Sequence, residues 1–326
     1  MTILQTITID KESQGQRLDH FLVKSLPELS RSKIQAMIKA GLVAVNGKEA
    51  AVHRFLKAGD SIEIMAEPLK LSAKAAKKIK TKQKFTGTPA AKLDLWKKIR
   101  IIDDTADYLV IEKPSGLLVH PTAKGERDTL IDWAATKYPE IAKIGDEPGR
   151  AGIVHRLDKE VSGLMVIPKT QDAFVYFKKL FKVRQIEKRY TALVYGEVKS
   201  DQGEINFPIG RSKDKEGLFA ATPENSGVGK PAKTLFWVKD RYKNYTLLEV
   251  EILTGRTHQI RVHLKAMGHP IVGDELYQGR NRKEKIKAPR IFLHAASLKF
   301  DDLAGRRQEY EAPLPKELKE MLEKVE

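Results

Sequence analysis

The chain has 326 residues, of which 41% are apolar, no cysteine, and a formal net charge of +16 at pH 7. The length favours two domains, and the absence of cysteine excludes disulfides, a thiolate nucleophile and a cysteine-based zinc site. The first residues lack the basic and apolar regions of a signal peptide, and no stretch is apolar enough for a membrane helix, so we expect a cytoplasmic protein. The basic excess favours a polyanionic partner, because neutralised phosphates release condensed counterions.

The first 65 residues predict a small module of two helices and two strands. One short helix begins near Leu18 and buries Leu18, Phe21 and Leu22. Ser30 is a candidate cap for a second helix that ends at Gly41, and an Asn46-Gly47 turn follows a strand over residues 42–45. Another strand is expected over 60–64. The inner stripe of the second helix is Ile34, Met37 and Ile38, and its basic rim is Arg31, Lys33 and Lys39.

This order of elements resembles the RNA-binding domain of the ribosomal protein S4 type. The segments that carry the resemblance are RLDHFL, SRSKIQAMIKAGLVAVNG and GDSIEI, between residues 15 and 65. The resemblance implies a domain over residues 1–68 that grips folded RNA by its shape and backbone. The alternative is an unrelated small α/β unit with a capped helix.

Residues 69–92 form a strongly basic stretch with eight lysines and no acid, which carries half of the net charge. Its lysine, alanine, threonine, glycine and proline residues cannot bury a core, so we predict a flexible linker. The lysines are suited to phosphate contacts, although solvation alone also accounts for them. A second domain is then expected over 93–326.

The second domain alternates apolar runs with a few helical patterns, and this predicts an α+β fold. Long strands that follow each other with few crossover helices favour a mixed, mainly antiparallel sheet with flanking helices. The expected strands are 108–111, 116–119, 163–167, 190–198, 234–239 and 246–253, the last two joined by a turn at Asn244. The expected helices are 128–137, 171–182 and 257–267.

The helix expected over 257–267 has two distinct faces. Thr257 is a candidate N-cap, and Ile260, Leu264 and Met267 form an apolar stripe at helical spacing. His258, Arg261 and Lys265 occupy another face, which can hold a carboxylate or a phosphate if it is sheltered. Taken alone, such a stripe is more often a solvated surface.

Four motifs in order, KPSGLLVHP, HRLDKEVSG, KRYTALVYG and GRTHQIRVHL, resemble the RNA pseudouridine synthases of the RluA/RluD type, which act on the large ribosomal subunit. The resemblance covers residues 100–315. It implies a pseudouridine synthase fold and an enzyme that detaches a uracil from its ribose, rotates it and rejoins it through carbon. It also implies that Asp158 is the catalytic residue, and that Arg156, Tyr190 and Arg261 bind the substrate.

The chemistry of these residue types agrees with those roles. A uridine in folded RNA must be flipped out, and Arg156 is suited to fill the gap while Tyr190 stacks on the base. Lys188 and Arg189 would add electrostatic attraction. Asp158 is expected to act as an anion, by attack on C1′ or C6 or by removal of a sugar proton, and Arg261 would keep it charged in a dry pocket.

Each of these residues also has an ordinary structural interpretation. Asp158 could be a turn residue paired with Lys159 or Arg156, Tyr190 a core aromatic, and Arg261 a surface cation. One departure is Val161, where the family usually has threonine; valine keeps the shape, and we expect activity to persist. His120, His155 and His263 are expected to be structural hydrogen-bonding groups.

Two other classes of function remain as alternatives. A non-catalytic ribosomal RNA-binding protein would not need Asp158, Tyr190 and Arg261. A glycoside hydrolase would need two separated carboxylates, and nothing in the sequence places Asp103-Asp104 or Asp301-Asp302 near Asp158. Transfer RNA is the alternative substrate. We expect no cofactor and no metal, since the chain lacks a phosphate-binding glycine motif and His258 and His263 have the wrong spacing. The expected partner is RNA, with neither DNA nor a membrane, and the chain is expected to be a monomer.

Overall fold

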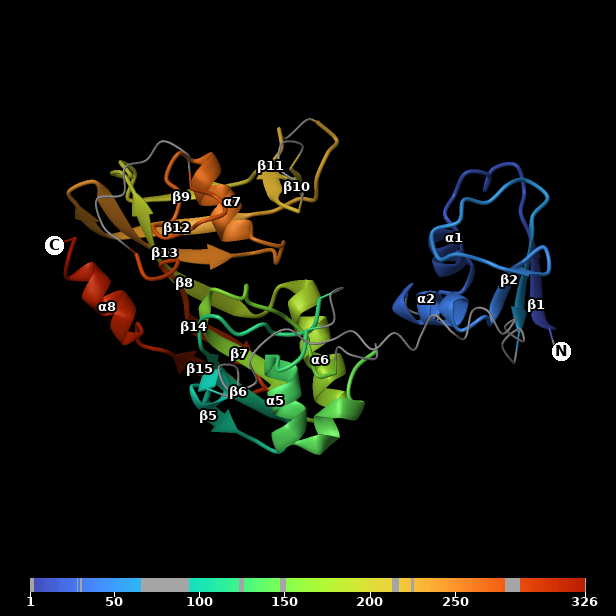
Figure 1. Ribbon diagram of the computed structural model, residues 1–326, viewed down its shortest axis with the longest axis horizontal. Coiled ribbons are helices and arrows are strands. Elements are labelled where there is room, and N and C mark those ends of the chain that lie inside the picture. Colours follow the sequence, from blue (N-terminus) through green and yellow to red (C-terminus); the bar gives the residue numbers. More distant parts are fainter. Residues whose placement is uncertain are drawn as a thin grey trace. The chain divides into compact units, whose positions relative to one another are not determined.

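The structure is a computed structural model that describes residues 3–27, 29, 31–65, 94–122, 126–146, 151–212, 217–223, 226–278 and 288–325. The chain divides into two compact units, Met1–Gly87 and Thr88–Glu326 (Figure 1). The predicted linker over residues 69–92 lies outside the described residues. The predicted limits of the domains stay predictions. In the described ranges, no helix combines the length and apolar character needed to cross a membrane.

The first unit is a small antiparallel sheet with two helices. Its described elements are β1 (Ile3–Thr8), α1 (Leu18–Ser25), α2 (Arg31–Lys39), β2 (Val43–Val45), β3 (Lys48–Glu49) and β4 (Ser61–Met65), with the strand order β1-β4-β2-β3. Both predicted helices and both predicted strands are confirmed, whereas β1 and β3 were not predicted. Asn46 and Gly47 both have positive φ, 56° and 69°, as the predicted hairpin turn requires. The proposed cap Ser30 lies outside the described residues.

The second unit contains, in its described part, one nine-stranded sheet in the order β5-β6-β7-β14-β8-β13-β12-β9, with β15 beside β14. Among its described strands only the pair β7–β14 is parallel, which confirms the predicted mixed, mainly antiparallel sheet. The strands of this sheet are β5 (Arg100–Asp104), β6 (Tyr108–Lys113), β7 (Ser162–Pro168), β8 (Glu187–Tyr195), β9 (Gln202–Ile205), β12 (Thr234–Tyr242), β13 (Tyr245–Ile252), β14 (Leu293–Asp301) and β15 (Arg307–Glu311). A separate hairpin consists of β10 (Ile209–Arg211) and β11 (Phe219–Ala221).

Helices cover both faces of this sheet. They are α5 (Leu130–Lys137), the 3-10 helix η1 (Pro139–Lys143), α6 (Gln171–Val183), α7 (Gln259–Ala266) and α8 (Lys316–Leu322). Alternate residues of β6 enter different cores: Leu109 and Ile111 pack in the same cluster as α5, and Tyr108 and Val110 pack with α6. The central strand β7 is therefore buried along its whole length.

One predicted strand, 116–119, is wrong. Gly116 has a φ of 88°, and the carbonyl groups of Leu118 and Val119 accept hydrogen bonds from the first amides of α5. Leu117 and Val119 are nevertheless buried. The apolar run reflects burial beneath a helix, which a short run cannot distinguish from a strand.

Gly163 is the last residue of the HRLDKEVSG motif and lies at the start of β7. Its φ is +123°, and an added Cβ would lie 2.3 Å from the carbonyl oxygen of Ala295 on β14. Only glycine permits this close approach of two backbones. The loop that ends at Val161 is thereby held against β14.

Candidate active site

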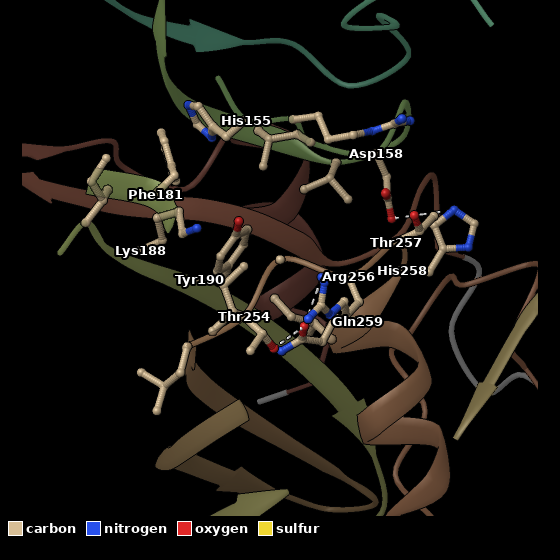
Figure 2. A pocket seen from close by; sticks show the side chains of 18 of the residues that line it. His155, Asp158, Phe181, Lys188, Tyr190, Thr254, Arg256, Thr257, His258 and Gln259 are labelled. Atoms are coloured by element: carbon tan, nitrogen blue, oxygen red, sulfur yellow. Dashed lines mark hydrogen bonds and ion pairs between the residues drawn. The ribbon is translucent and has the colours of Figure 1, made fainter. Parts of the chain in front are cut away.

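A pocket of about 560 Å³ opens beside β8, between the loop that precedes β7 and the N-terminus of α7. Arg156, Asp158, Tyr190 and Arg261 all line it, so the fold brings together the four residues singled out in the sequence. Figure 2 shows the Tyr190 ring rising from its strand toward the segment that carries His155 and Asp158. The volume lies within the range of about 300–1,000 Å³ that small-molecule sites occupy.

Asp158 lies at one end of this pocket and is paired with a cation. The Nη1 group of Arg261 donates to Oδ2 of Asp158 at 3.2 Å, and the side chains of Arg261 and Asp158 are 3% and 17% exposed. The Nε2 atom of His258 lies 3.9 Å from the same oxygen, and Figure 2 shows the His258 ring beside Asp158. Asp158 is therefore a largely enclosed carboxylate with a guanidinium beside it, although the two residues are far apart in the chain.

A second carboxylate, Asp274, orients Arg261. Its two oxygens accept hydrogen bonds from Nε and Nη2 of Arg261, both at 2.8 Å, and its side chain is fully buried. Burial disfavours the guanidinium, but the bonds and charge of Asp274, followed by Asp158, outweigh it and raise the pKa of Arg261. Because Asp274 occupies one edge of the guanidinium, the Nη1 group is left for Asp158. Sequence reasoning missed Asp274; an acid within the apolar stretch IVGDELY was the available signal, since buried acids need partners.

The start of α7 differs from the prediction. Thr257 does not cap the helix; the cap residue is His258, which has a φ of 55° and makes no side-chain cap hydrogen bond. The side chain of Gln259 instead accepts a hydrogen bond from the backbone amide of Arg256. The left-handed conformation places the His258 ring beside Asp158, where its Nδ1 atom bonds the hydroxyl of Tyr277 at 2.8 Å. Burial lowers the pKa of His258.

The KPSG segment holds the loop that carries Asp158. Lys113 is fully buried, and its ammonium donates to the carbonyl groups of Pro114, Leu117 and Lys159. The amide of Gly116 also donates to the carbonyl of Lys159, at 2.8 Å. Burial lowers the pKa of Lys113 to about 7, while three carbonyl acceptors match the three hydrogens of its charged form. Sequence reasoning identified the KPSG motif but did not show that Lys113 holds the Asp158 loop through the carbonyl of Lys159.

Tyr190 and Arg156 differ in exposure. Tyr190 is only 5% exposed, and burial raises the pKa of its hydroxyl. Arg156 is exposed, and its Nη1 group donates to Nε2 of His120 at 3.1 Å. The pocket thus has a buried aromatic ring, Tyr190, and a long, exposed cationic side chain, Arg156. Stacking on a base and filling the gap in the RNA would require such groups.

The three histidines expected to be structural form such hydrogen bonds. His120 bonds the carbonyl of Pro121, His155 accepts from the amide of Val166, and His263 bonds Thr234 and the carbonyl of Phe207. Among the residues that the structure describes, no three histidine, aspartate or glutamate side chains are grouped so as to hold a metal ion.

The chain is similar to known proteins over most of its length. Residues 107–266 match the RNA pseudouridylate synthase family, and residues 16–62 match the S4 domain. The ribosomal large subunit pseudouridine synthase D of Haemophilus influenzae is 34% identical over 96% of this chain and 92% of its own length. An uncharacterized RNA pseudouridine synthase of Aquifex aeolicus is 39% identical over 85% of this chain and 81% of its own.

The chain belongs to the RNA pseudouridine synthases. It is therefore an RNA-binding isomerase with an S4 domain at its N-terminal end. Its fold agrees with that of a solved structure, human RNA pseudouridylate synthase domain containing 4, with a TM-score of 0.56, 26% identity, and coverage of 72% of this chain and 95% of that one.

The structure also shows how Val161 fits beside Asp158. The valine side chain is 2% exposed and packs in the main core, and its backbone amide donates to the carbonyl of Asp158 at 3.2 Å. An apolar side chain at this buried position leaves no hydroxyl without a partner. The backbone turn that presents Asp158 is retained.

Proposed function

We propose that this synthase converts uridines of large-subunit ribosomal RNA to pseudouridine, with Asp158 as the catalytic anion. The observation that carries the catalytic assignment is the 3.2 Å ion pair between Asp158 and Arg261 in a pocket that Tyr190 also lines. The choice of RNA is supported by relatives of similar length whose names specify the large ribosomal subunit. That substrate implies action in the cytoplasm.

In the proposed mechanism, the target nucleotide leaves the RNA stack and its uracil contacts the Tyr190 ring. Extrusion costs a few kcal/mol, and Arg156 at the opening of the pocket is long and planar enough to replace the lost stacking. The flipped nucleotide excludes water from Asp158, and Arg261 stabilises the carboxylate as the surroundings become less polar.

The reaction exchanges one bond for another. The bond between C1′ and N1 breaks, a bond between C1′ and C5 forms, C5 loses its hydrogen and N1 gains one. The product is an isomer of the substrate, so the chemistry needs neither an oxidant nor a reductant. Asp158 assists as an anion whether it attacks C1′, attacks C6, or removes a sugar proton.

Tritium release tests the proposal directly. Large-subunit ribosomal RNA carrying uridine tritiated at C5 should release label with the wild-type chain, because C5 becomes the attachment point. Asp158→Ala should release none above background, whereas Asp240→Ala, which changes an exposed aspartate on β12, should match the wild type. Binding without release would favour a non-catalytic RNA-binding protein. Release from transfer RNA alone would replace the ribosomal substrate.

We also propose that the S4 domain holds RNA outside the catalytic pocket. A chain without residues 1–68 should bind ribosomal RNA more weakly and with a shallower dependence on salt, because it makes fewer phosphate contacts. Its remaining tritium release should still depend on Asp158. Equal affinity and equal salt dependence in the truncated and full-length chains would contradict this role.

A further inference from the structure

Strand β8 carries two cations beside Tyr190, and the structure separates them. Lys188 lines the pocket together with Tyr190, as expected for residues two apart on a strand. Arg189 lies between them and bonds Glu249 of β13 at 2.7 Å, with its guanidinium over the ring of Trp237. The expectation that both cations attract the substrate is therefore corrected: Arg189 is bound in a protein network, and only Lys188 faces the cavity.

Lys188 is a cation without a protein anion. Its ammonium lies 4.8 Å from the centre of the Phe181 ring, and Figure 2 shows it between Phe181 and Tyr190. Within the described residues it forms no ion pair. Burial lowers the pKa of Lys188 to about 8, since the charged form has lost water and gained no carboxylate. A ligand that supplies negative charge would relieve this cost.

The acids that line the pocket do not neutralise all of its lining cations. Its three acids are Asp158, Glu187 and Glu251. Asp158 is held by Arg261, and the other two pair with cations that do not line the pocket: Glu187 with Arg307 and Glu251 with Arg189. In the described part of the chain, the lining cations that form no ion pair are Arg156, Lys182, Arg184, Lys188 and Arg256. Of these, Arg156 bonds His120 and Arg256 bonds the carbonyl of Pro231.

Lys182, Arg184 and Lys188 lie near one another in the fold. Lys182 is in the last turn of α6, Arg184 is the residue that ends this helix, and Phe181, which contacts Lys188, precedes them. Cations at the end of a helix also complement its dipole, so Lys182 and Arg184 alone would not indicate a ligand. Lys188 belongs to a strand, and the helix dipole does not account for its place in the pocket.

We propose that Lys188, with Lys182 and Arg184, forms a phosphate subsite for the RNA backbone beside the flipped nucleotide. An RNA strand carries one phosphodiester on each side of every nucleoside, and an ammonium is a common partner for such a group. The identity of the nucleotide rests on the proposed function, whereas the phosphate site can be tested by binding alone.

The probe is uridine 3′,5′-bisphosphate, which carries both phosphates that flank a nucleoside in RNA, with uridine as the phosphate-free comparison. Calorimetry on the full-length chain should show bisphosphate affinity falling about tenfold or more in Lys188→Met, as for loss of a charge-assisted hydrogen bond, with uridine affinity unchanged. Lys188→Arg should retain most of the bisphosphate affinity. Lys179→Met removes the same charge from an exposed position of α6 outside the lining, and it should bind as the wild type does.

Proton uptake distinguishes a phosphate ligand from a packing role. Near pH 9 the Lys188 amine of the free protein is largely neutral, and a bound phosphate would favour its charged form, so binding should take up protons in the wild type but not in Lys188→Met. Calorimetry in two buffers of different ionisation enthalpy measures this uptake.

Three results would overturn the subsite. One is equal bisphosphate affinity in Lys188→Met and Lys179→Met. Another is an equal loss of affinity for uridine and for the bisphosphate in Lys188→Met, which would place Lys188 against the base or make it a packing residue. The third is binding of inorganic phosphate as tightly as the bisphosphate, which would mean a site for free anions. A lack of tritium release would overturn the proposed function and leave these measurements intact.

Discussion

The buried arrangement of Asp158, Arg261 and Asp274 predicts that stability and catalysis can be separated by two substitutions. Arg261→Met leaves Asp274 fully buried without its cation and Asp158 largely enclosed without its own. Removing one partner of a buried ion pair costs about 3–5 kcal/mol. For a unit of this size that loss corresponds to a decrease of about 6–20 °C in the melting temperature.

A second substitution, Asp274→Asn, should recover much of that stability in the Arg261→Met background. The asparagine removes the uncompensated charge, and its oxygen can still accept the amide hydrogens of Leu276 and Tyr277, which Asp274 accepts at 3.1 Å. Thermal unfolding followed by circular dichroism, with the wild type and both single variants alongside, measures the recovery.

Activity should not return with stability. At 3.2 Å the attraction between Arg261 and Asp158 amounts to about 5 kcal/mol at an effective dielectric constant of about 20. Even a partial loss of this stabilisation predicts single-turnover tritium release slowed by about a hundredfold or more in both Arg261→Met and the double variant. If the double variant regained activity, or if Arg261→Met unfolded within about 1 kcal/mol of the wild type, the reasoning about this triad would be wrong.

Three further predictions concern the pocket wall and the strand that supports it. Tyr190→Phe should keep tritium release within a few-fold, whereas Tyr190→Leu should lower it by about 5- to 160-fold, as expected for loss of about 1–3 kcal/mol of stacking; equal rates would exclude a stacking role. Burial, followed by the charge of Lys188, lowers the pKa of His155 from 6.5 to about 3, so the unfolded chain binds a proton that the folded chain does not, and stability should fall as the pH drops between these values. His155→Gln keeps an acceptor for the amide of Val166 and should reduce this slope, measured by urea unfolding at pH 6 and pH 4, by up to about 1.4 kcal/mol per pH unit; an unchanged slope would contradict the buried neutral histidine. Gly163→Ala should prevent folding because its Cβ would overlap the backbone of β14, whereas Gly255→Ala meets nothing within 4 Å and should fold normally, as the yield of soluble protein and the circular dichroism spectrum would show.

The motifs alone were sufficient to identify the family and to single out Asp158, Tyr190 and Arg261, because chain order and residue type are properties of the sequence. The alternation of strand residues places Arg189 and Tyr190 on opposite faces of β8, although Lys188 and Arg189 were both expected to attract the substrate. It did not show which face the pocket lies on, since that depends on the loop before β7 and on α7, which the sequence places far away.

Other parts of the site depend on contacts between distant segments. Asp274 follows Arg261 by thirteen positions, a separation with no helical or strand periodicity, so only the folded chain shows that it grips the guanidinium. The same holds for Lys113, whose ammonium reaches the carbonyl of Lys159. Residues 116–119 were misread as a strand because burial under α5 and burial in a sheet produce the same apolar run.

The sequence by itself therefore determined the residue types, the order of the motifs and the family, because local pattern and composition are sufficient for these. The tertiary structure decided which charges remain unpaired. An ion pair is a property of two side chains in space, and whether Lys188 has an anionic partner follows only once every acid of the pocket has been assigned to its own cation.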